Sequence, residues 1–450
     1  MALDALLLVR EGGYSQRVLD RLCWRARLSP RDRRLAWELT LGTLRWRGRL
    51  SAALNQQLEQ GLESLPDAAQ ELLLMSAYQL FFLSKIPAHA AIFEGVELAK
   101  LCARGLERLV NGVLRSLDRD GIAPSPELQA LLEDPEGAEG SLPLSVEGLE
   151  ALAEWLSAPS WWLEQRIERN GLRAAIQLAE RNNEPAPLTI TPTPGVSLET
   201  LTASLERDGA QWTPGRFAST ALHLELERPF QSRSFRNQLW FVQDEAAQLV
   251  CLLASERPAQ RVWDMCAAPG GKSLGLLRAL SADGSLLATD VHEGKVEALR
   301  ERLGQDTRVR VLQHDGRRPM RDEDPFDLIV VDAPCSALGL LRRHPEIRWR
   351  RGPAEVEALA HEQARLLDIA LRSLKPNGVL VYSVCTDSPE EGDEQIQRLL
   401  ERRRTLSLAL PTGAPWDTLT RGRFGFNVGP GIEGCDGFFF TRLQLQAEEE

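Results

Sequence analysis

Two cysteines stand directly after long apolar runs in the second half of the chain. Cys335 follows FDLIVVDAP, and Cys385 follows GVLVYSV. A single cysteine in such a place is usually a small buried apolar residue. A thiol at a strand end can also ionise to a thiolate, which is a strong nucleophile. If the two runs are neighbouring strands, one cysteine could attack a substrate while the other assists its release.

A glycine-rich turn, DMCAAPGGKS (264–273), separates an apolar run typical of a strand from LGLLRAL, which is typical of a helix. A phosphate-binding P-loop needs glycine where Cys266 stands. We therefore expect a ligand that needs close backbone approach but no cluster of phosphate donors, and S-adenosyl-L-methionine has no pyrophosphate. The loop residues predicted to surround it are Cys266, Ala267, Ala268, Pro269, Gly270, Gly271 and Lys272.

Three aspartates end the apolar runs that follow this turn. Asp290 lies twenty residues beyond Gly270, the spacing at which an acid reaches a ribose hydroxyl pair. Asp315 ends the third run, where it could meet an adenine amino group, and Asp332 ends the fourth, facing the reactive end of the cofactor. Each acid alone could be a turn former or a helix cap. Behind one glycine turn, the three together favour an adenosine-containing cofactor.

Beside a methyl donor, the two cysteines indicate methylation of a pyrimidine carbon. Cytosine C5 is a poor nucleophile, but a thiolate that adds to C6 makes C5 enamine-like and able to take a methyl group. The C5 proton must then leave and the thiolate must be expelled. The residues alone leave the two roles open, because DNA cytosine methyltransferases attack from a Pro-Cys, which here is Cys335.

A basic segment, LLRRHPEIRWRRG, comes directly after Cys335 and interleaves arginines with a histidine and a tryptophan. Such a segment can grip phosphates and stack a base. A solvated basic helix surface is the alternative. The predicted RNA-binding residues are Arg342, Arg343, His344 and Arg348.

A sheet must position these residues. Over 236–450, apolar runs alternate with helical patterns, which predicts an α/β domain with a mostly parallel, Rossmann-like sheet covered on both faces. Ligands bind such a sheet at the carboxyl ends of its strands, where the glycine turn, acids and cysteines fall. Residues 160–235 alternate short strands with helices and predict a small α+β module that binds RNA.

The first part of the chain has a different pattern. Residues 1–125 carry apolar residues at three- and four-residue spacing, which predicts an all-α domain. Residues 126–159 gather proline, glycine and acids, as expected of a linker with a connecting helix. The net charge of −11 argues against a nucleic-acid partner, yet residues 1–50 hold eleven arginines against five acids.

Composition limits the cellular setting. No apolar stretch approaches membrane-spanning length, and the first residues lack a cleavable signal, so we expect a cytoplasmic protein that does not enter a membrane. The seven cysteines are scattered without a C-x-x-C pair, which predicts reduced thiols and no metal site. We expect a monomer.

The motifs together resemble the bacterial ribosomal RNA 5-methylcytosine methyltransferases of the RsmB (Sun/Fmu) type, within the wider Nol/Nop/Sun group. The resemblance covers nearly the whole chain. In the catalytic domain it is carried by DMCAAPGGKS, HDGR (314–317), DAPCSALGLLRRHPEIRW, YSVCT (382–386), WFVQDEAAQLV (240–250) and DGFFFTRL (436–443). In the helical region, RDRRLAWELTLGTLR, PAHAAIFEGVELAK and LVNGVLR resemble a NusB-like RNA-binding domain.

The resemblance implies a role for each matched residue. Cys385 would be the nucleophile, Cys335 would assist release, and Asp332 would hydrogen-bond the cytosine ring and help to activate it. Asp290, Asp315 and Asp332 would surround S-adenosyl-L-methionine together with the glycine turn. The implied reaction forms 5-methylcytosine in small-subunit (16S) ribosomal RNA through a covalent adduct between cysteine and C6, on a base that is flipped or already unpaired.

Two departures from the family pattern bear on the target nucleotide. Ala337-Leu338-Gly339 stands where the family more often has threonine before glycine, and Val384-Cys385-Thr386 replaces Thr-Cys-Ser. Both leave the chemistry intact. The NusB-like region favours ribosomal RNA over transfer RNA as the substrate.

Two functions of other classes are the alternatives. A non-catalytic RNA-binding or assembly factor could keep the fold, but the intact cysteine pair speaks against it. A P-loop NTPase is disfavoured by the missing glycine at position 266 and by the absence of an evident magnesium-binding pattern.

Overall fold

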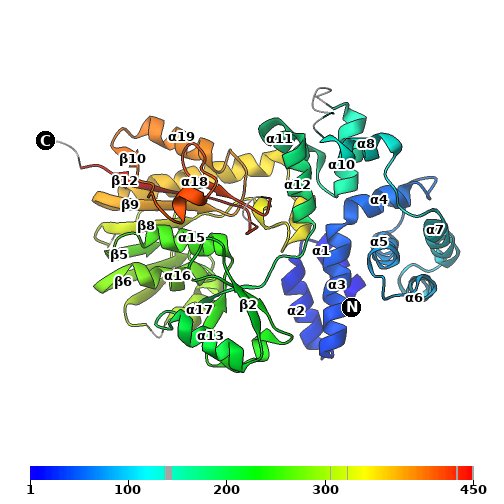
Figure 1. The fold of residues 1–450 in the computed structure, drawn as a ribbon, viewed down its shortest axis with the longest axis horizontal. Coiled ribbons are helices and arrows are strands. Elements are labelled where there is room, and N and C mark those ends of the chain that lie inside the picture. Colours follow the sequence, from blue (N-terminus) through cyan, green and yellow to red (C-terminus); the bar gives the residue numbers. More distant parts are fainter. Residues whose placement is uncertain (136, 138–143, 305, 322, 432–433, 448–450) are drawn as a thin grey trace. The chain divides into compact units, whose positions relative to one another are not determined.

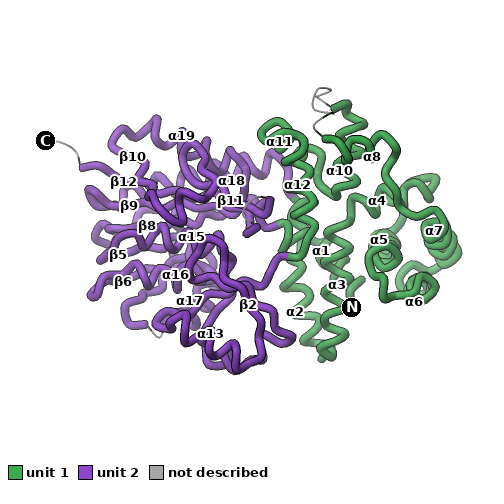
Figure 2. The backbone as a smooth tube through the Cα atoms, viewed as in Figure 1, with its two compact units in different colours: residues 1–185, 341–350 green, residues 186–340, 351–450 purple. Residues whose placement is uncertain are grey.

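The computed structural model describes residues 1–135, 137, 144–304, 306–321, 323–431 and 434–447. These residues divide into two compact units (Figure 2). The helical unit comprises Met1–Pro185 and Leu341–Arg350, and the sheet unit comprises Ala186–Leu340 and Arg351–Glu450.

The helical unit confirms the predicted all-α region (Figure 1). Its central helix is α5 (Asp67–Phe82), whose leucines at 72, 73 and 74 are fully buried. Gly42 of α3 (Pro30–Arg45) is required where α3 meets α5, because a Cβ there would lie 2.0 Å from the ring of Tyr78. The other helices are α1 (Ala2–Arg10), α2 (Ser15–Arg25), α4 (Arg47–Asn55), α6 (Ala88–Cys102), α7 (Glu107–Asp120), α8 (Pro126–Glu133), α10 (Val146–Leu156), α11 (Ser160–Asn170) and α12 (Leu172–Asn182).

The sheet unit begins with a small antiparallel sheet of order β2-β3-β1-β4. Its strands are β1 (Thr189–Pro192), β2 (Gln211–Pro214), β3 (Leu222–Glu225) and β4 (Trp240–Val242), accompanied by α13 (Leu198–Arg207) and α14 (Arg233–Arg236). The Glu245 carboxylate ties this sheet to the helix that follows it, since it accepts a hydrogen bond from the Ala218 backbone N–H at 2.8 Å. The residues of the predicted module 160–235 fall into both units. Helices α11 and α12 belong to the helical unit, whereas the strands belong to the sheet unit.

The large sheet has the order β10-β12-β9-β8-β5-β6-β7, with β11 paired to β12. The five predicted parallel strands are β5 (Ala259–Asp264), β6 (Leu280–Asp290), β7 (Val309–Gln313), β8 (Phe326–Asp332) and β9 (Leu374–Val384). Three strands that the sequence analysis did not foresee, β10 (Leu406–Leu408), β11 (Phe426–Val428) and β12 (Phe438–Leu445), form an antiparallel edge. Strand order reverses between β5 and β8, and open α/β sheets bind their ligands at the carboxyl ends of the strands at such a point.

Helices cover both faces of this sheet because its strands are apolar on both sides. Val262 and Val330 pack in one core with α15 (Glu245–Ala254) and α16 (Gly271–Leu276). Their neighbours Trp263 and Val331 point the other way, into a core with α18 (Pro353–Arg372) and α19 (Asp393–Arg402). A further helix, α17 (Glu293–Leu303), lies between β6 and β7 in the chain.

The segment Leu341–Arg350 leaves the sheet unit and becomes part of the helical unit (Figure 2). Its side chains form hydrogen bonds with backbone groups at the ends of helices. The Glu346 carboxylate accepts hydrogen bonds from the Ser15 N–H at 3.0 Å and from its hydroxyl at 2.9 Å, at the first residue of α2. Arg350 donates to the carbonyls of Gly13 at 2.7 Å and Gly12 at 3.3 Å, just beyond the end of α1.

Arg348 is the centre of this segment and is 2% exposed. Its guanidinium donates to the carbonyls of Arg45 at 3.3 Å, Ser157 at 2.6 Å and Asn182 at 3.1 Å, and to the side-chain oxygen of Asn183 at 2.7 Å. The last carbonyls of a helix have no partner within the helix, and a cation is favourable there. One arginine therefore satisfies the carboxyl ends of α3, α10 and α12.

We predict that Arg348→Ala lowers the free energy of unfolding of the helical unit by about 3–5 kcal/mol, because several buried carbonyls lose their donor at once. Urea unfolding of the full chain, followed by far-ultraviolet circular dichroism, measures this loss. Arg25→Ala removes an exposed guanidinium of the same unit and is the control, with an expected change within about 0.5 kcal/mol. Equal midpoints for the two variants would contradict the buried role of Arg348.

Candidate active site

The glycine turn lies between β5 and α16, as predicted. Gly270 adopts φ +91°, and its N–H donates to the Ala267 carbonyl at 2.7 Å. A Cβ at Gly270 would lie 3.0 Å from the side chain of Leu299 in α17, so the turn needs glycine for both its backbone and its packing. The Ala267 N–H donates to the Thr289 carbonyl at 2.8 Å, which fixes the turn beside the end of β6.

Asp264, the last residue of β5, is fully buried beneath this turn. Its Oδ2 accepts a hydrogen bond from the Ser273 hydroxyl at 2.6 Å, while Oδ1 has no hydrogen-bond partner. Burial raises the pKa of Asp264 to about 7. The sequence analysis did not select this residue, although it is the first residue of the glycine-rich turn.

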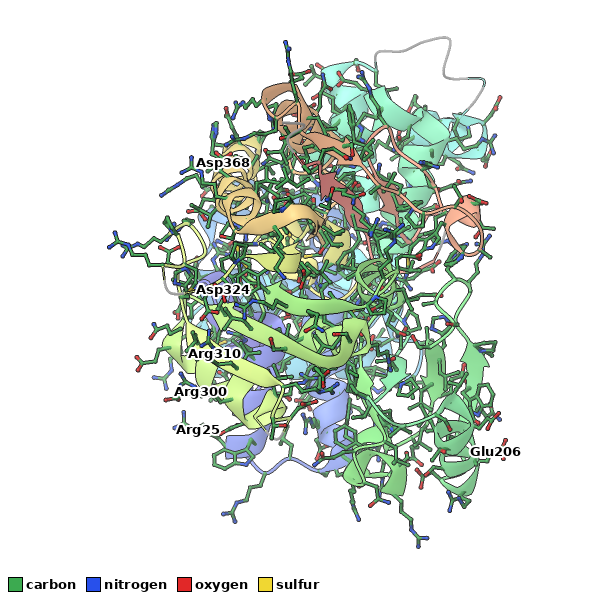
Figure 3. The ribbon with its side chains drawn as sticks, turned by 90° about the vertical axis from the view of Figure 1, so that its left-hand side faces the viewer. Arg25, Glu206, Arg300, Arg310, Asp324 and Asp368 are labelled. Carbon is green, nitrogen blue, oxygen red and sulfur yellow. The ribbon has the colours of Figure 1, made fainter. Side chains whose placement is uncertain are left out.

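We predict a pH dependence of stability from Asp264. In the folded chain the Asp264 carboxyl keeps its proton up to about pH 7, whereas in the unfolded chain it loses the proton near pH 4. The free energy of unfolding should therefore fall between pH 4 and pH 7, by at most about 1.4 kcal/mol per pH unit. Asp264→Asn should remove this fall in thermal or urea unfolding series. Asp324→Asn, at an exposed carboxylate labelled in Figure 3, is the control and should keep the wild-type profile.

Asp290 lies at the end of β6, and Asp315 lies two residues beyond the end of β7. Asp290 is the last residue of β6, and its Oδ1 accepts a hydrogen bond from the His292 N–H at 3.0 Å. The His314 N–H donates to the Asp290 carbonyl at 3.1 Å, which brings the two strand ends together. The Arg317 guanidinium donates to Asp315 at 2.8 Å and lowers the pKa of that carboxyl to about 2. Asp315 is therefore ionised at neutral pH.

Asp332 holds two polar side chains at the end of β8. Its Oδ2 accepts from the Lys272 ammonium at 2.6 Å, and its Oδ1 accepts from the Ser383 hydroxyl of β9 at 2.8 Å. Burial lowers the pKa of Lys272, but the Asp332 carboxylate more than offsets this effect and the pKa is raised. Lys272 is thus a positive charge fixed at the end of β8. Its Nζ also lies 5.1 Å from the ring centre of Phe438, on the edge strand β12.

The two candidate cysteines meet in space. The Sγ atoms of Cys335 and Cys385 are 3.2 Å apart, although fifty residues separate them in the chain. The hydrogen bond with Cys385 and burial raise the pKa of Cys335 well above its ordinary value. Cys335 therefore retains its proton, which it can donate to the sulfur of Cys385. Both side chains are partly exposed.

A buried acid that sequence reasoning missed supports both cysteine loops. The Glu391 carboxylate accepts hydrogen bonds from the Ser336 N–H at 2.9 Å, from the Ser336 hydroxyl and from the Gln363 amide at 2.9 Å. The hydroxyl oxygens of Ser336 and Thr386 are also within hydrogen-bond distance of each other, at 3.0 Å. Ser336 follows Cys335 and Thr386 follows Cys385, so this group of polar residues ties the two loops directly together. In the sequence, Glu391 lies within SPEEGDE, which is typical of a solvated turn.

Main-chain contacts fix the same loops. The Gly339 N–H donates to the Cys385 carbonyl at 3.1 Å, and the Gly437 N–H donates to the Gly339 carbonyl at 2.8 Å. A Cβ at Gly339 would lie 1.9 Å from the Gly437 carbonyl oxygen, so Gly339 packs directly on the DGFFFTRL segment (436–443). The departure Ala337-Leu338 precedes this contact and leaves it intact.

The structure gathers the glycine turn, Lys272, Asp290, Asp332, Cys335 and Cys385 in the sheet unit, at the carboxyl ends of β5, β6, β8 and β9. It places the predicted RNA-binding segment in the helical unit. Arg342 is 8% exposed and donates to the Pro185 carbonyl at 3.4 Å, and Arg348 is buried as described. Arg343 and His344 are partly exposed. Arg342 and Arg348 therefore do not form the solvent-facing basic surface that the sequence suggested, because the fold uses their donors.

Comparison with known proteins places this site in a family. A family model described as 16S rRNA methyltransferase RsmB/F matches residues 250–444, and the NusB family model matches residues 1–119. Ribosomal RNA small subunit methyltransferase B of Citrobacter koseri is 32% identical over 441 residues, which cover 97% of this chain and 95% of that protein. The chain belongs to the RsmB/F family of 16S rRNA methyltransferases. The protein of the same name from Vibrio cholerae is 32% identical over 433 residues, covering 93% of this chain and 91% of its own length.

Solved structures share the fold of this RsmB/F family member. PH0851 has a TM-score of 0.80 at 20% identity, covering 98% of this chain and 97% of that one. NSun6 from Pyrococcus horikoshii, crystallised with SFG, has a TM-score of 0.56 at 18% identity and covers 64% of this chain and 99% of that one. The predicted fold class is confirmed: a Rossmann-like methyltransferase domain that follows an all-α NusB-like domain and a small antiparallel sheet.

Membership of the RsmB/F family also confirms the predicted enzyme class, an S-adenosyl-L-methionine-dependent rRNA cytosine methyltransferase. None of the described helices combines the length and apolar composition needed to cross a bilayer. Among the residues that the structure describes, no three His, Cys, Asp or Glu side chains gather as metal ligands would.

Proposed function

We propose that the protein forms 5-methylcytosine in 16S ribosomal RNA through a covalent adduct between Cys385 and cytosine C6. The observation that carries the mechanism is the 3.2 Å approach of the Cys335 and Cys385 sulfurs beside the Lys272–Asp332 pair. The substrate follows from the family and from the small-subunit methyltransferases that align with the whole chain.

The residues present fit S-adenosyl-L-methionine. Asp290 uses Oδ1 for the His292 N–H, so its second oxygen remains an acceptor that suits a ribose diol. Asp264 offers a buried oxygen without a partner, and the turn at Gly270 allows close backbone approach. We assign the cofactor to residues 266–272, Asp290, Asp315 and Asp332. The cofactor supplies an electrophilic methyl group.

Each side chain then has a separate role in the reaction. The Cys385 thiolate adds to C6, which makes C5 nucleophilic, and Asp332 hydrogen-bonds the cytosine ring while Lys272 holds the Asp332 carboxylate in place. After methyl transfer, a water molecule takes the C5 proton, and the Cys335 thiol assists release by donating a hydrogen bond to the departing sulfur of Cys385. Loss of that proton restores the C5–C6 double bond and breaks the sulfur–carbon bond, which returns Cys385 as a thiolate.

The partners can be stated more finely as part of this proposal. We infer a monomer that acts in the cytoplasm, where its ribosomal RNA substrate is made. Of the predicted RNA-binding residues, we keep Arg343 and His344, whose side chains are partly exposed, and leave out Arg342 and Arg348 because their donors are used in the fold.

Transfer of labelled methyl groups from S-adenosyl-L-methionine to 16S ribosomal RNA tests the function, with bisulfite sequencing to locate 5-methylcytosine. We expect transfer to one cytosine. Transfer RNA is the control substrate and should remain unlabelled. Label in transfer RNA alone would contradict the substrate, and no label in any RNA would favour the alternative of an assembly factor.

A further inference from the structure

The helices α2 and α3 and the turn that joins them carry a strongly basic stretch of the chain. Seven arginines and only two aspartates lie between positions 14 and 34, in a chain whose net charge is −11. All seven arginine side chains are exposed: Arg17, Arg21, Arg25, Arg27, Arg31, Arg33 and Arg34. So strong a local excess in an acidic protein suits a polyanionic partner.

A tryptophan stands in the middle of these charges. Trp24 is 82% exposed, the largest exposure among the large apolar side chains of the described residues. It borders a hollow of about 580 Å³ lined by Cys23, Trp24, Arg25, Arg27, Leu28 and Arg33. An exposed aromatic face surrounded by guanidinium groups is the arrangement that stacks a base while holding its phosphates.

The backbone holds this hollow in shape. Arg27 adopts φ +50° at the end of α2, where its N–H donates to the Trp24 carbonyl at 3.2 Å. The Leu28 N–H donates to the Cys23 carbonyl at 3.3 Å, and the Ser29 hydroxyl accepts from the Asp32 N–H to begin α3. Trp24 thus projects from a closed helix end rather than from an open loop.

The donors around the tryptophan are available. Arg33 pairs with Asp20 at 2.5 Å, but both side chains are more than half exposed, so a phosphate can compete for this pair. Among the described residues, no carboxylate lies within ion-pair distance of Arg25 or Arg27. Arg25, labelled in Figure 3, is the last residue of α2.

We propose that this Trp24 hollow binds an unpaired nucleotide of the RNA substrate, with the base stacked on Trp24 and the flanking phosphates on Arg25, Arg27 and Arg33. Single-stranded RNA is favoured over a duplex, because paired bases in an A-form helix are not free to stack on a side chain. The inference rests on the proposed function only in taking RNA as the substrate. The site lies in the helical unit, whereas the two cysteines lie in the sheet unit.

Binding of a short fluorescein-labelled single-stranded RNA to the full chain tests the site by fluorescence anisotropy. Trp24→Ala should weaken binding roughly 5- to 100-fold, because the stacking of one base is removed. Trp24→Phe keeps an aromatic ring and should retain most of the affinity. The double change Arg25→Ala with Arg27→Ala should lower the slope of log affinity against log salt by about 0.7 for each phosphate that is no longer neutralised.

Arg300→Ala, an exposed arginine of α17 labelled in Figure 3, is the matched control and should bind as the wild type does. In methyl transfer, Trp24→Ala should raise KM for ribosomal RNA and leave kcat unchanged. Wild-type affinity and salt slope in both the Trp24→Ala and the double arginine variants would overturn the site, even if the enzyme methylates RNA. A wild type that binds single-stranded RNA at Trp24 without methylating any RNA would instead contradict the proposed function alone.

Discussion

Cys385→Ala is expected to abolish methyl transfer and to form no covalent complex with RNA, whereas Cys335→Ala accumulates one. Loss of the nucleophile removes the step that activates C5, so the rate should fall by about 10³-fold or more. Loss of Cys335 leaves addition and methyl transfer possible but slows expulsion of the Cys385 thiolate. Denaturing gels of protein mixed with labelled ribosomal RNA, together with methyl counting, measure both outcomes.

The contact between the two sulfurs makes this comparison sharp. Each alanine removes the same 3.2 Å contact and a side chain of the same size, so a purely structural effect would be shared by both variants. Cys251→Ala is a further control, because that thiol is buried beside α16 and lies outside the pair. Identical behaviour of the Cys335 and Cys385 variants would contradict separate roles. An adduct trapped only in Cys385→Ala would show that Cys335 is the nucleophile and Cys385 the residue that assists release.

Asp332→Asn should lower kcat by about 10²–10³-fold, the second largest effect that we expect. The asparagine keeps the size of the side chain but leaves the Lys272 ammonium without its counter-charge, beside the position assigned to the cytosine ring. Lys272→Met should reduce kcat in the same way, because it frees the carboxylate that Lys272 holds. Single-turnover methylation at saturating RNA and cofactor measures both.

Asp368→Asn is the control for Asp332, since Asp368 is a carboxylate of α18 whose ion pair with Arg403 is solvent-exposed at 3.6 Å. Exposed pairs of this kind contribute little. We expect wild-type kcat from this variant. The double variant Asp332→Asn with Lys272→Met tests coupling: losses that multiply independently would show that the pair does not act as a unit.

The sequence predicted the catalytic sheet and most of its site residues for a simple physical reason. In a parallel sheet the carboxyl ends of strands meet at one edge, so residues such as Asp290 and Cys385 could be placed together from their positions after apolar runs. Their contacts could not be placed in the same way. The pairing of Lys272 with Asp332 depends on the order of strands β5 and β8, which the pattern of apolar residues does not encode.

Two groups of residues show what a local pattern leaves out. Arg348 and Arg25 lie in similar basic segments, yet one satisfies buried helix ends and the other is exposed. Their difference comes from residues far away in the chain. Glu391 lies in an acidic run that suggests a solvated turn, but hydrogen bonds from Ser336 and Gln363 allow its burial. The edge strands β10, β11 and β12 were missed because they are short or lie in a segment noted only for its family motif.

The placement of Leu341–Arg350 has a consequence for synthesis on the ribosome. The helical unit is encoded first, up to Pro185, but the arginines that satisfy its helix ends arrive only with Arg350. At roughly 5–20 residues per second, the nascent helices must wait on the order of ten to thirty seconds for those donors. The two units therefore cannot mature strictly one after the other, and the amino-terminal half reaches its final stability only after the Cys335 loop has emerged.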